Sequence, residues 1–130
     1  MAGIPEKKGG GRYLKNRLKA FHAAFQGFRF GWKEAHFKLY IFISALVIIF
    51  GFWLNVSAVE WCILTVCCGF VIVTEVLNTA IENLADSVTT EFDPLIGKAK
   101  DLAAAAVVIS AVTALIIAAI IFLPKLQVKI

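Results

Sequence analysis

The chain has 130 residues, of which 60% are hydrophobic and 17% charged, and its mean hydropathy is +0.83. Soluble domains are roughly half apolar and about a quarter charged, so this composition indicates a protein in contact with lipid. It excludes a soluble enzyme, a nucleic-acid-binding module and a secreted disulfide scaffold. Lys and Arg outnumber Asp and Glu by 13 to 9, and nine of the 13 lie between Lys7 and Lys38.

The N-terminal part combines a polar leader with an amphipathic segment. Residues 1–11 are polar and glycine-rich, which predicts a disordered leader. Bulky apolar residues then recur at steps of three and four, the period of one helical face, with Lys and Arg on the other faces. We therefore predict an amphipathic helix over about 13–33 that lies in the membrane interface. The apolar positions are Leu14, Leu18, Phe21, Phe25 and Phe28.

Three stretches without charged side chains follow this segment: Leu39–Val59, Trp61–Thr74 and Leu102–Pro124. A helix needs about 20 mainly apolar residues to cross the hydrocarbon core, and the second stretch reaches that length only if the helix continues through Glu75. We predict membrane spans at about 37–56, 60–86 and 101–123. The fold class is then an all-α membrane protein, with one integral membrane domain over 12–130.

The distribution of basic residues predicts the orientation. Lys and Arg gather before the first span, and such a cluster marks the cytoplasmic side. The N-terminus and the segment between the second and third spans are then cytoplasmic. Lys125 and Lys129 would lie outside and mildly oppose this orientation, but the first helix usually dominates.

The second predicted span carries a row of polar residues at spacings of three, four and seven, so they share one helical face. At 1.5 Å per residue, Glu75 lies about 22 Å along the axis from Glu60, inside the hydrocarbon core. A carboxylate at that depth is costly and indicates a functional site, where it can act as a proton acceptor. The alternative is a structural hydrogen bond between helices. The row consists of Glu75, Asn78, Thr79, Glu82 and Asp86.

Two further features indicate phosphate chemistry. Glu34, beside the first span, and Glu82 could approach one another, and two carboxylates suit Mg²⁺ bound together with substrate phosphates. Pro94 and Gly97 break the helical pattern before Lys100, and lysine is a point-charge partner for phosphate. No G-x-x-x-x-G-K-[ST] motif is present, which excludes a P-loop.

The polar face resembles the E-x-x-N-[ST]-A-I-E-x-x-x-D signature of the small prokaryotic diacylglycerol kinase family, which includes undecaprenol kinases; here it reads Glu75-Val-Leu-Asn78-Thr-Ala-Ile-Glu82-Asn-Leu-Ala-Asp86. Ala99-Lys100-Asp101 with Ala105-Ala106-Val107 is similar to the family's A-K-D-x-x-x-A-A-V element, and Glu34-Ala-His-Phe37-Lys38 to its E-x-x-F-R. The resemblance implies a homotrimer in the bacterial inner membrane, with active sites that are shared between subunits and use Mg²⁺ and ATP.

The resemblance also implies roles for individual residues. Glu75 corresponds to the general base, Glu34 and Glu82 to metal ligands that also contact ATP, and Asn78 and Asp86 to supporting polar positions. The family's N-terminal arginine aligns with Asn16, and we assign its phosphate contact to the neighbouring Arg17. The ATP-binding set is completed by Glu91, Asp93, Lys100 and Asp101. The lipid substrate is expected at His36, Phe37, Lys38 and Ala104.

Three functions remain open at this stage. The first is phosphorylation of a lipid alcohol, with diacylglycerol converted to phosphatidic acid. The second is an undecaprenol kinase that makes undecaprenyl phosphate, because Ala104 stands where the best-known diacylglycerol kinases have Ser. The third is a small proton- or cation-conducting membrane protein in which Glu75, Glu82 and Asp86 form a relay.

Overall fold

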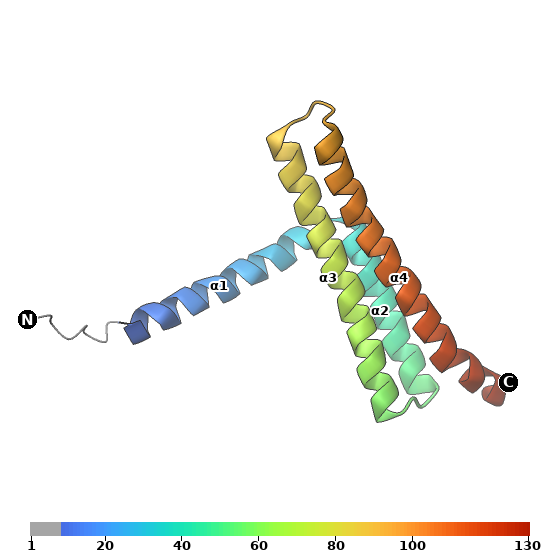
Figure 1. Ribbon diagram of the computed structural model, residues 1–130. Helices are drawn as coiled ribbons and strands as arrows, with labels where there is room; N and C mark the ends of the chain where they lie inside the picture. The colour runs from blue at the N-terminus through green and yellow to red at the C-terminus, as the bar shows by residue number, and fades with distance from the viewer. Residues whose placement is uncertain (1–8) are drawn as a thin grey trace, which may run out of the picture. The chain divides into compact units, whose positions relative to one another are not determined.

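The computed structural model describes residues 9–130, and their regular secondary structure is entirely helical. The helices are α1 (Gly9–Gly31), α2 (Ala35–Trp53), α3 (Ala58–Val88) and α4 (Pro94–Lys129) (Figure 1). Internal contacts divide the chain into one unit that ends at Lys33 and a second that spans Glu34–Ile130, and each unit is described by itself. The all-α prediction is confirmed, whereas one domain over 12–130 stays a prediction.

The first unit consists of α1, a helix of 23 residues with no buried side chain. The apolar positions of its predicted face are exposed, as an interface helix requires. The helix begins at Gly9, so the prediction of a disordered leader is wrong for residues 9–11; residues 1–8 lie outside the described residues. Glycine lowers helix propensity by about 1 kcal/mol, but adding residues to an existing helix is much easier than nucleating one.

The second unit contains three helices that are long and apolar enough to cross a membrane, and these are α2, α3 and α4. They confirm the prediction of three spans, with ends that differ by two to seven residues from those expected. Most of their large apolar side chains are exposed in this unit, which fits helices whose surrounding solvent is lipid.

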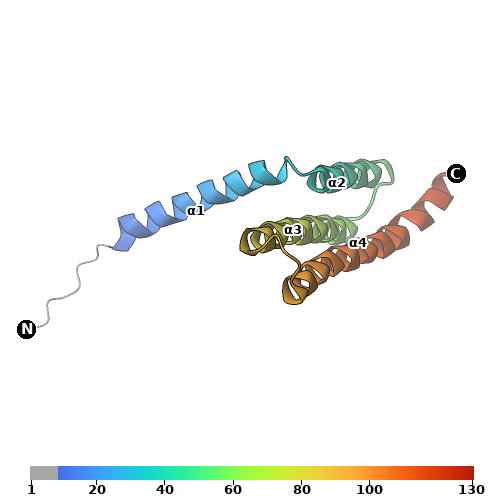
Figure 2. The ribbon, with the colours of Figure 1, turned by 90° about the horizontal axis from the view of Figure 1, so that it is seen from above.

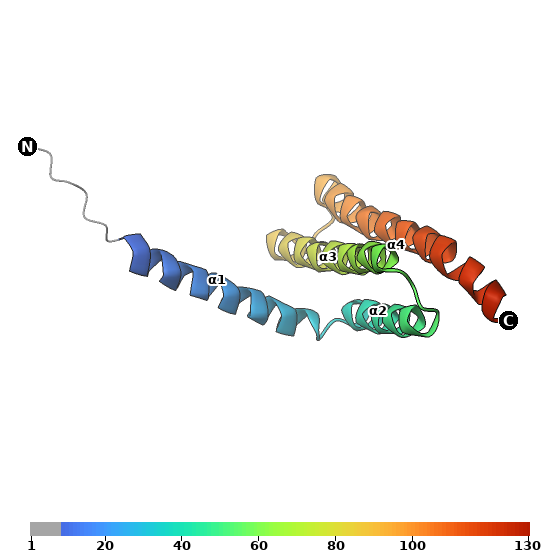
Figure 3. The ribbon, with the colours of Figure 1, turned by 90° about the horizontal axis from the view of Figure 1, so that it is seen from below.

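α3 is the central helix of this unit. It packs against both neighbours, more extensively against α4 than against α2. The views from above and from below both place α3 between α2 and α4 (Figures 2 and 3). Because α3 carries the polar face, side chains from both neighbouring helices can approach that face.

The end of the bundle where α2 meets α3 holds the main apolar core. Val56, Leu64 and Ile121 are buried there, with Val47, Trp61, Ile117 and Phe122 packed against them. A side chain at Gly51 would place its Cβ 2.5 Å from the Trp61 ring, so glycine permits this close approach.

Polar contacts reinforce the same end. Ser57 and Glu60 form a capping box at the start of α3, with Ser57 N donating to Glu60 Oε2 at 2.8 Å. Lys125 Nζ lies 3.1 Å from Glu60 Oε2, and Lys129 Nζ donates to the Trp53 carbonyl at 2.8 Å. Both lysines that oppose the predicted orientation are therefore bound to other parts of the protein.

The start of α4 corrects the sequence analysis. Pro94 is the first residue of the helix and Gly97 lies inside it, so the predicted break of the helical pattern at these residues is wrong. Proline suits the first helical position because its missing N–H would have no partner there. Asp93 caps the helix, its Oδ1 accepting from Leu95 N at 2.9 Å and Ile96 N at 3.3 Å. α4 also continues through Pro124 to Lys129, beyond the predicted end at 123.

Candidate active site

The polar face of α3 changes from buried to exposed along its length. Glu75 and Asn78 are buried, with 4% and 9% of their surface exposed, and Thr79 is half-buried. Glu82 and Asp86, nearer the end where α3 meets α4, are exposed. Along this face, the Glu75 carboxylate is therefore enclosed by protein, whereas the carboxylates of Glu82 and Asp86 are exposed.

The Glu75 carboxylate points toward α2. Its Oε1 lies 3.9 Å from Nδ1 of His36, in the first turn of that helix. This distance is too long for a hydrogen bond. The Glu75 side chain is only 5% exposed, whereas the His36 side chain is 79% exposed. The buried Glu75 carboxylate thus faces α2 next to the exposed His36 side chain.

The Asn78 side chain forms a hydrogen bond with Glu82, and its own oxygen atom lacks a hydrogen-bond partner among residues 9–130. Its Nδ2 donates to Glu82 Oε1 at 3.2 Å, one helical turn away. Within residues 9–130, its buried Oδ1 has no hydrogen-bond partner. A buried acceptor without a donor costs about 1–3 kcal/mol, so a bound ligand that supplies a donor or a cation would stabilise this position.

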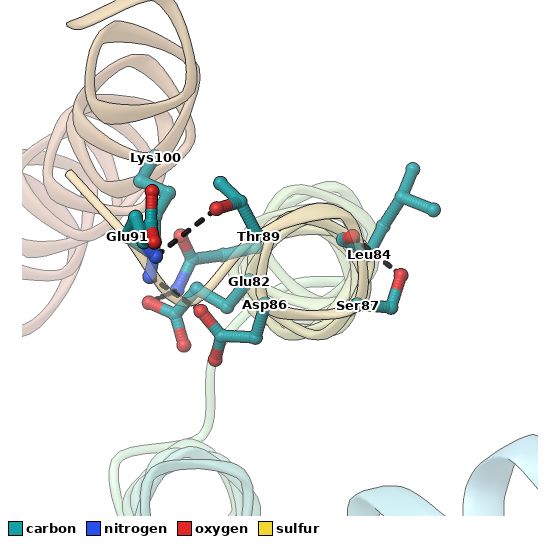
Figure 4. Close-up of polar contacts among 8 residues, drawn as sticks. Glu82, Leu84, Asp86, Ser87, Thr89, Glu91 and Lys100 are labelled. Carbon is teal, nitrogen blue, oxygen red and sulfur yellow. Dashed lines mark hydrogen bonds and ion pairs between the residues drawn. The ribbon is translucent and has the colours of Figure 1, made fainter. Parts of the chain in front are cut away.

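A polar pocket of about 350 Å³ lies at the end where α3 meets α4. Lys100 Nζ of α4 donates to Asp86 Oδ1 of α3 at 2.8 Å across it (Figure 4). The backbone N–H of Glu91 donates to Thr89 Oγ1 at 3.0 Å and orders the loop. The pocket is lined by Asp86, Thr89, Thr90, Glu91, Phe92, Asp93, Ile96, Gly97 and Lys100.

Four residues of the predicted ATP and supporting sets thus line one pocket: Glu91, Asp93, Lys100 and Asp86. Asp93 also caps α4, which leaves its second carboxylate oxygen for other contacts. Asp101 is exposed on α4 outside this lining.

The predicted lipid and phosphate positions are more scattered. Phe37 is buried, with 2% of its surface exposed, whereas Lys38 and Ala104 are exposed. Arg17 belongs to the α1 unit, where its Nη2 donates to the Tyr13 hydroxyl oxygen at 2.8 Å. Its contact with phosphate stays a prediction.

The oxygen donors near Glu82 fit a magnesium ion that is bound together with a phosphate. Among residues 9–130, no three His, Cys, Asp or Glu side chains gather closely enough to enclose a metal. Mg²⁺, however, usually takes only one or two carboxylates and completes its coordination with water and substrate phosphates. The unpaired Asn78 Oδ1 beside the Glu82 carboxylate is a donor set of this kind. Glu34, at the N-cap of α2, makes no capping hydrogen bond and keeps its carboxylate available.

The comparison with known families decides between a lipid kinase and an ion-conducting membrane protein. The family model described as prokaryotic diacylglycerol kinase matches residues 22–122. The chain belongs to this family. The match covers all of α2 and α3 and most of α4, including every candidate site residue except Arg17.

Individual relatives agree with this assignment. The chain is 42% identical over 93 residues to an undecaprenol kinase of Bacillus subtilis, a match that covers 72% of this chain and 76% of that protein. It is 34% identical over 100 residues to the diacylglycerol kinase of Escherichia coli, covering 76% and 82%. A diacylglycerol kinase of Helicobacter pylori is 33% identical over 104 residues, covering 79% of each chain.

Membership of the prokaryotic diacylglycerol kinase family confirms the predictions of a membrane-embedded lipid kinase and of ATP as its phosphoryl donor. The roles of individual residues, the magnesium ion, the orientation and the trimer stay predictions.

The sequence analysis missed one buried polar contact beside the site. Thr74, the residue before Glu75, lies with its Oγ1 2.8 Å from Ser110 Oγ of α4. Thr74 stands outside the polar row because it faces a different helix. The available signal was Ser110 itself, which with Thr113 is one of two hydroxyl residues in the alanine-rich sequence of the third span.

Proposed function

We propose that this kinase transfers the terminal phosphoryl group of ATP to the hydroxyl of a membrane lipid, with Glu75 as the general base. The observation that carries the proposal is the enclosed Glu75 carboxylate in the middle of a membrane-spanning helix. An ionisable side chain at such a position is expensive in lipid and therefore indicates function.

Glu75 is placed to act on a group that arrives from the lipid. Its carboxylate accepts the proton of the lipid hydroxyl as the oxygen attacks phosphorus, a step that typically contributes 10²–10⁴-fold to the rate. The neighbouring His36 side chain is 79% exposed, so the lipid hydroxyl would approach the enclosed carboxylate from the side of His36. The apolar chains of the lipid would stay in the bilayer beside the apolar helices while its hydroxyl reaches Glu75.

The nucleotide approaches from the opposite direction. The pocket beside Lys100 is polar and lies at the end of the bundle, and the Lys100 ammonium can bind phosphate oxygens. Glu82 lies between this pocket and Glu75, about 10 Å along the helix from Glu75. Glu82 and Glu34 would hold Mg²⁺, which when bound neutralises charge on the phosphate oxygens. In this proposal the nucleotide binds near Asp86 at the end of α3, and the lipid hydroxyl binds at Glu75, further along the same helix.

This arrangement implies an orientation. The end where α3 meets α4 faces the cytoplasm of a bacterium, where ATP is found, and the enzyme lies in the inner membrane with its N-terminus inside. The concentration of basic residues before α2 supports this orientation. The resemblance to the family supports a homotrimer, and the exposed apolar surface of the second unit leaves room for such contacts.

Diacylglycerol is the first candidate acceptor, because relatives from several bacteria are named diacylglycerol kinases. Undecaprenol is the second candidate. The identity of 42% with the undecaprenol kinase, against 34% with the Escherichia coli diacylglycerol kinase, is the observation that supports this second candidate.

The decisive experiment supplies radiolabelled ATP and magnesium to the purified full-length protein in bilayers that contain either diacylglycerol or undecaprenol. We expect a labelled lipid with one acceptor and much less with the other. The Glu75→Gln variant should keep its fold and its affinity for MgATP but lose about 100-fold or more in turnover. Near-normal turnover in Glu75→Gln would remove the general-base role, and the absence of labelled lipid with both acceptors would refute the proposed substrates.

A further inference from the structure

A buried pair of hydroxyl groups joins α3 to α4 at the level of Glu75. Ser110 is 1% exposed and Thr74 is 9% exposed, and their hydroxyl oxygens are 2.8 Å apart. The buried apolar residues Val71 and Val107 lie one turn earlier on each helix. Water has little access to the pair, so each hydroxyl must find its partners within the protein.

The hydroxyl protons of Thr74 and Ser110 form hydrogen bonds that connect α3 to α4. Thr74 Oγ1 lies 2.9 Å from the Val71 carbonyl oxygen, and Ser110 Oγ lies 2.8 Å from the Val107 carbonyl oxygen. Each hydroxyl carries one proton, so one hydroxyl donates to its own helix while the other donates across the interface. Either arrangement fixes both side-chain rotamers and ties the α3 backbone to the α4 backbone.

Thr74 is the residue before Glu75, so the contact between Thr74 and Ser110 affects where the Glu75 carboxylate lies. Adjacent residues of an α-helix point about 100° apart, so Thr74 faces α4 while Glu75 faces His36 of α2. Two adjacent residues of α3 thus face different helices, and the hydrogen bond of Thr74 to α4 lies next to the reacting carboxylate. The Cα atoms lie about 2.3 Å from the helix axis and the carboxylate several ångströms further out, so a rotation of roughly 10° moves the carboxylate by about 1 Å.

We propose that Thr74 and Ser110 are positioning residues, whose shared hydrogen bond sets the rotation of α3 and thereby the placement of the Glu75 carboxylate against the lipid hydroxyl. The proposal rests on the proposed function, since it takes Glu75 as the general base. Misplacement of a reacting group by about 1 Å can cost as much as 10²-fold in rate. The nucleotide pocket has no residue in common with this contact and lies further along α3, so the contact should affect MgATP binding much less than it affects the chemical step.

The test measures kcat and KM for MgATP in bilayers with the acceptor that the unmodified enzyme phosphorylates. Thr74→Val and Ser110→Ala should each lower kcat by about tenfold and leave KM for MgATP within about twofold. The double variant should be no slower than the slower single variant, because both substitutions remove the same hydrogen bond. Thr74→Ser retains the hydroxyl and should restore most of the rate.

Thr65→Val is the matched control. Thr65 also lies in α3, but it is exposed and its Oγ1 donates only to the Trp61 carbonyl at 2.7 Å, within its own helix. This substitution should leave kcat unchanged. Thermal unfolding of each variant in the same bilayers shows whether a loss of rate reflects loss of folded protein.

The decisive comparison adds Thr74→Val to Glu75→Gln. A residue that acts through Glu75 should have no further effect on the residual rate once that carboxylate is absent. A further tenfold loss in the combined variant would overturn the positioning role, and so would unchanged kcat in Thr74→Val and Ser110→Ala. An equal loss in Thr74→Ser would also overturn it. An active Glu75→Gln would instead refute the proposed function, so the two failures are distinguishable.

Discussion

The ion pair between Lys100 and Asp86 allows a sharp test of nucleotide binding. The pair joins α4 to α3 at 2.8 Å, but the lysine side chain is 39% exposed and the aspartate 65% exposed. Water screens such a pair, so it contributes at most about 1 kcal/mol to the stability of the fold. A charge-assisted hydrogen bond from Lys100 to a phosphate contributes about 1.5–3 kcal/mol to binding.

These magnitudes separate a structural role from a binding role. Since about 1.4 kcal/mol corresponds to a factor of ten, Lys100→Met should raise KM for MgATP roughly 10- to 100-fold. The same variant should unfold at nearly the temperature of the unmodified protein. Initial rates of lipid phosphorylation at increasing MgATP, with unfolding followed in the same bilayers, measure both quantities.

Lys98→Met is the control for this prediction. Lys98 is exposed on α4 and does not line the pocket, and side chains two residues apart on a helix point about 200° apart. Both substitutions remove one positive charge. An equal rise of KM in the two variants would show a general electrostatic effect, and an unchanged KM in Lys100→Met would refute the contact with phosphate.

Three further predictions concern other parts of the bundle. Glu82→Ala should weaken binding of MgATP, measured by equilibrium titration, because one of few metal-binding oxygens is lost; an unchanged affinity would contradict the metal role. Gly51→Ala should destabilise the fold by about 1–3 kcal/mol, because the new Cβ would lie 2.5 Å from the Trp61 ring. Ser57→Ala removes the capping hydroxyl and should cost about 1 kcal/mol. Thermal unfolding tests the last two substitutions, and kcat of the folded enzyme should be unchanged in both.

The spans and the polar face were predictable because they depend on local properties. Length without charge predicts a membrane-spanning helix, and spacings of three and four place Glu75, Asn78 and Glu82 on one face. The structure shows that this face is enclosed by protein at Glu75 and open at Glu82.

Helix ends were predicted less well. Pro94 and Gly97 predict a break of the helical pattern, whereas in the structure Asp93 caps the helix and proline is favourable at its first position. Gly9, Gly10 and Gly11 are also helical, although glycine has low helix propensity. In both places the structural context outweighs the preference of a single residue.

Contacts between helices could not be predicted from the sequence. The approach of His36 to Glu75 and that of Thr74 to Ser110 depend on how α3 is rotated between its neighbours. That rotation results from packing along the whole length of the helices, and no short motif encodes it.

The two ends of the three-helix unit are held together very differently. Around Ser57 and Leu64, capping hydrogen bonds, an ion pair and buried apolar side chains connect all three helices. Around Asp86 and Lys100, the helices share a polar pocket and one exposed ion pair. Few contacts must break for α3 and α4 to separate slightly there, so we expect this end to open more easily than the opposite end, which would let a nucleotide enter and leave the proposed site. Amide hydrogens around Thr89 should accordingly exchange with solvent much faster than those around Leu64.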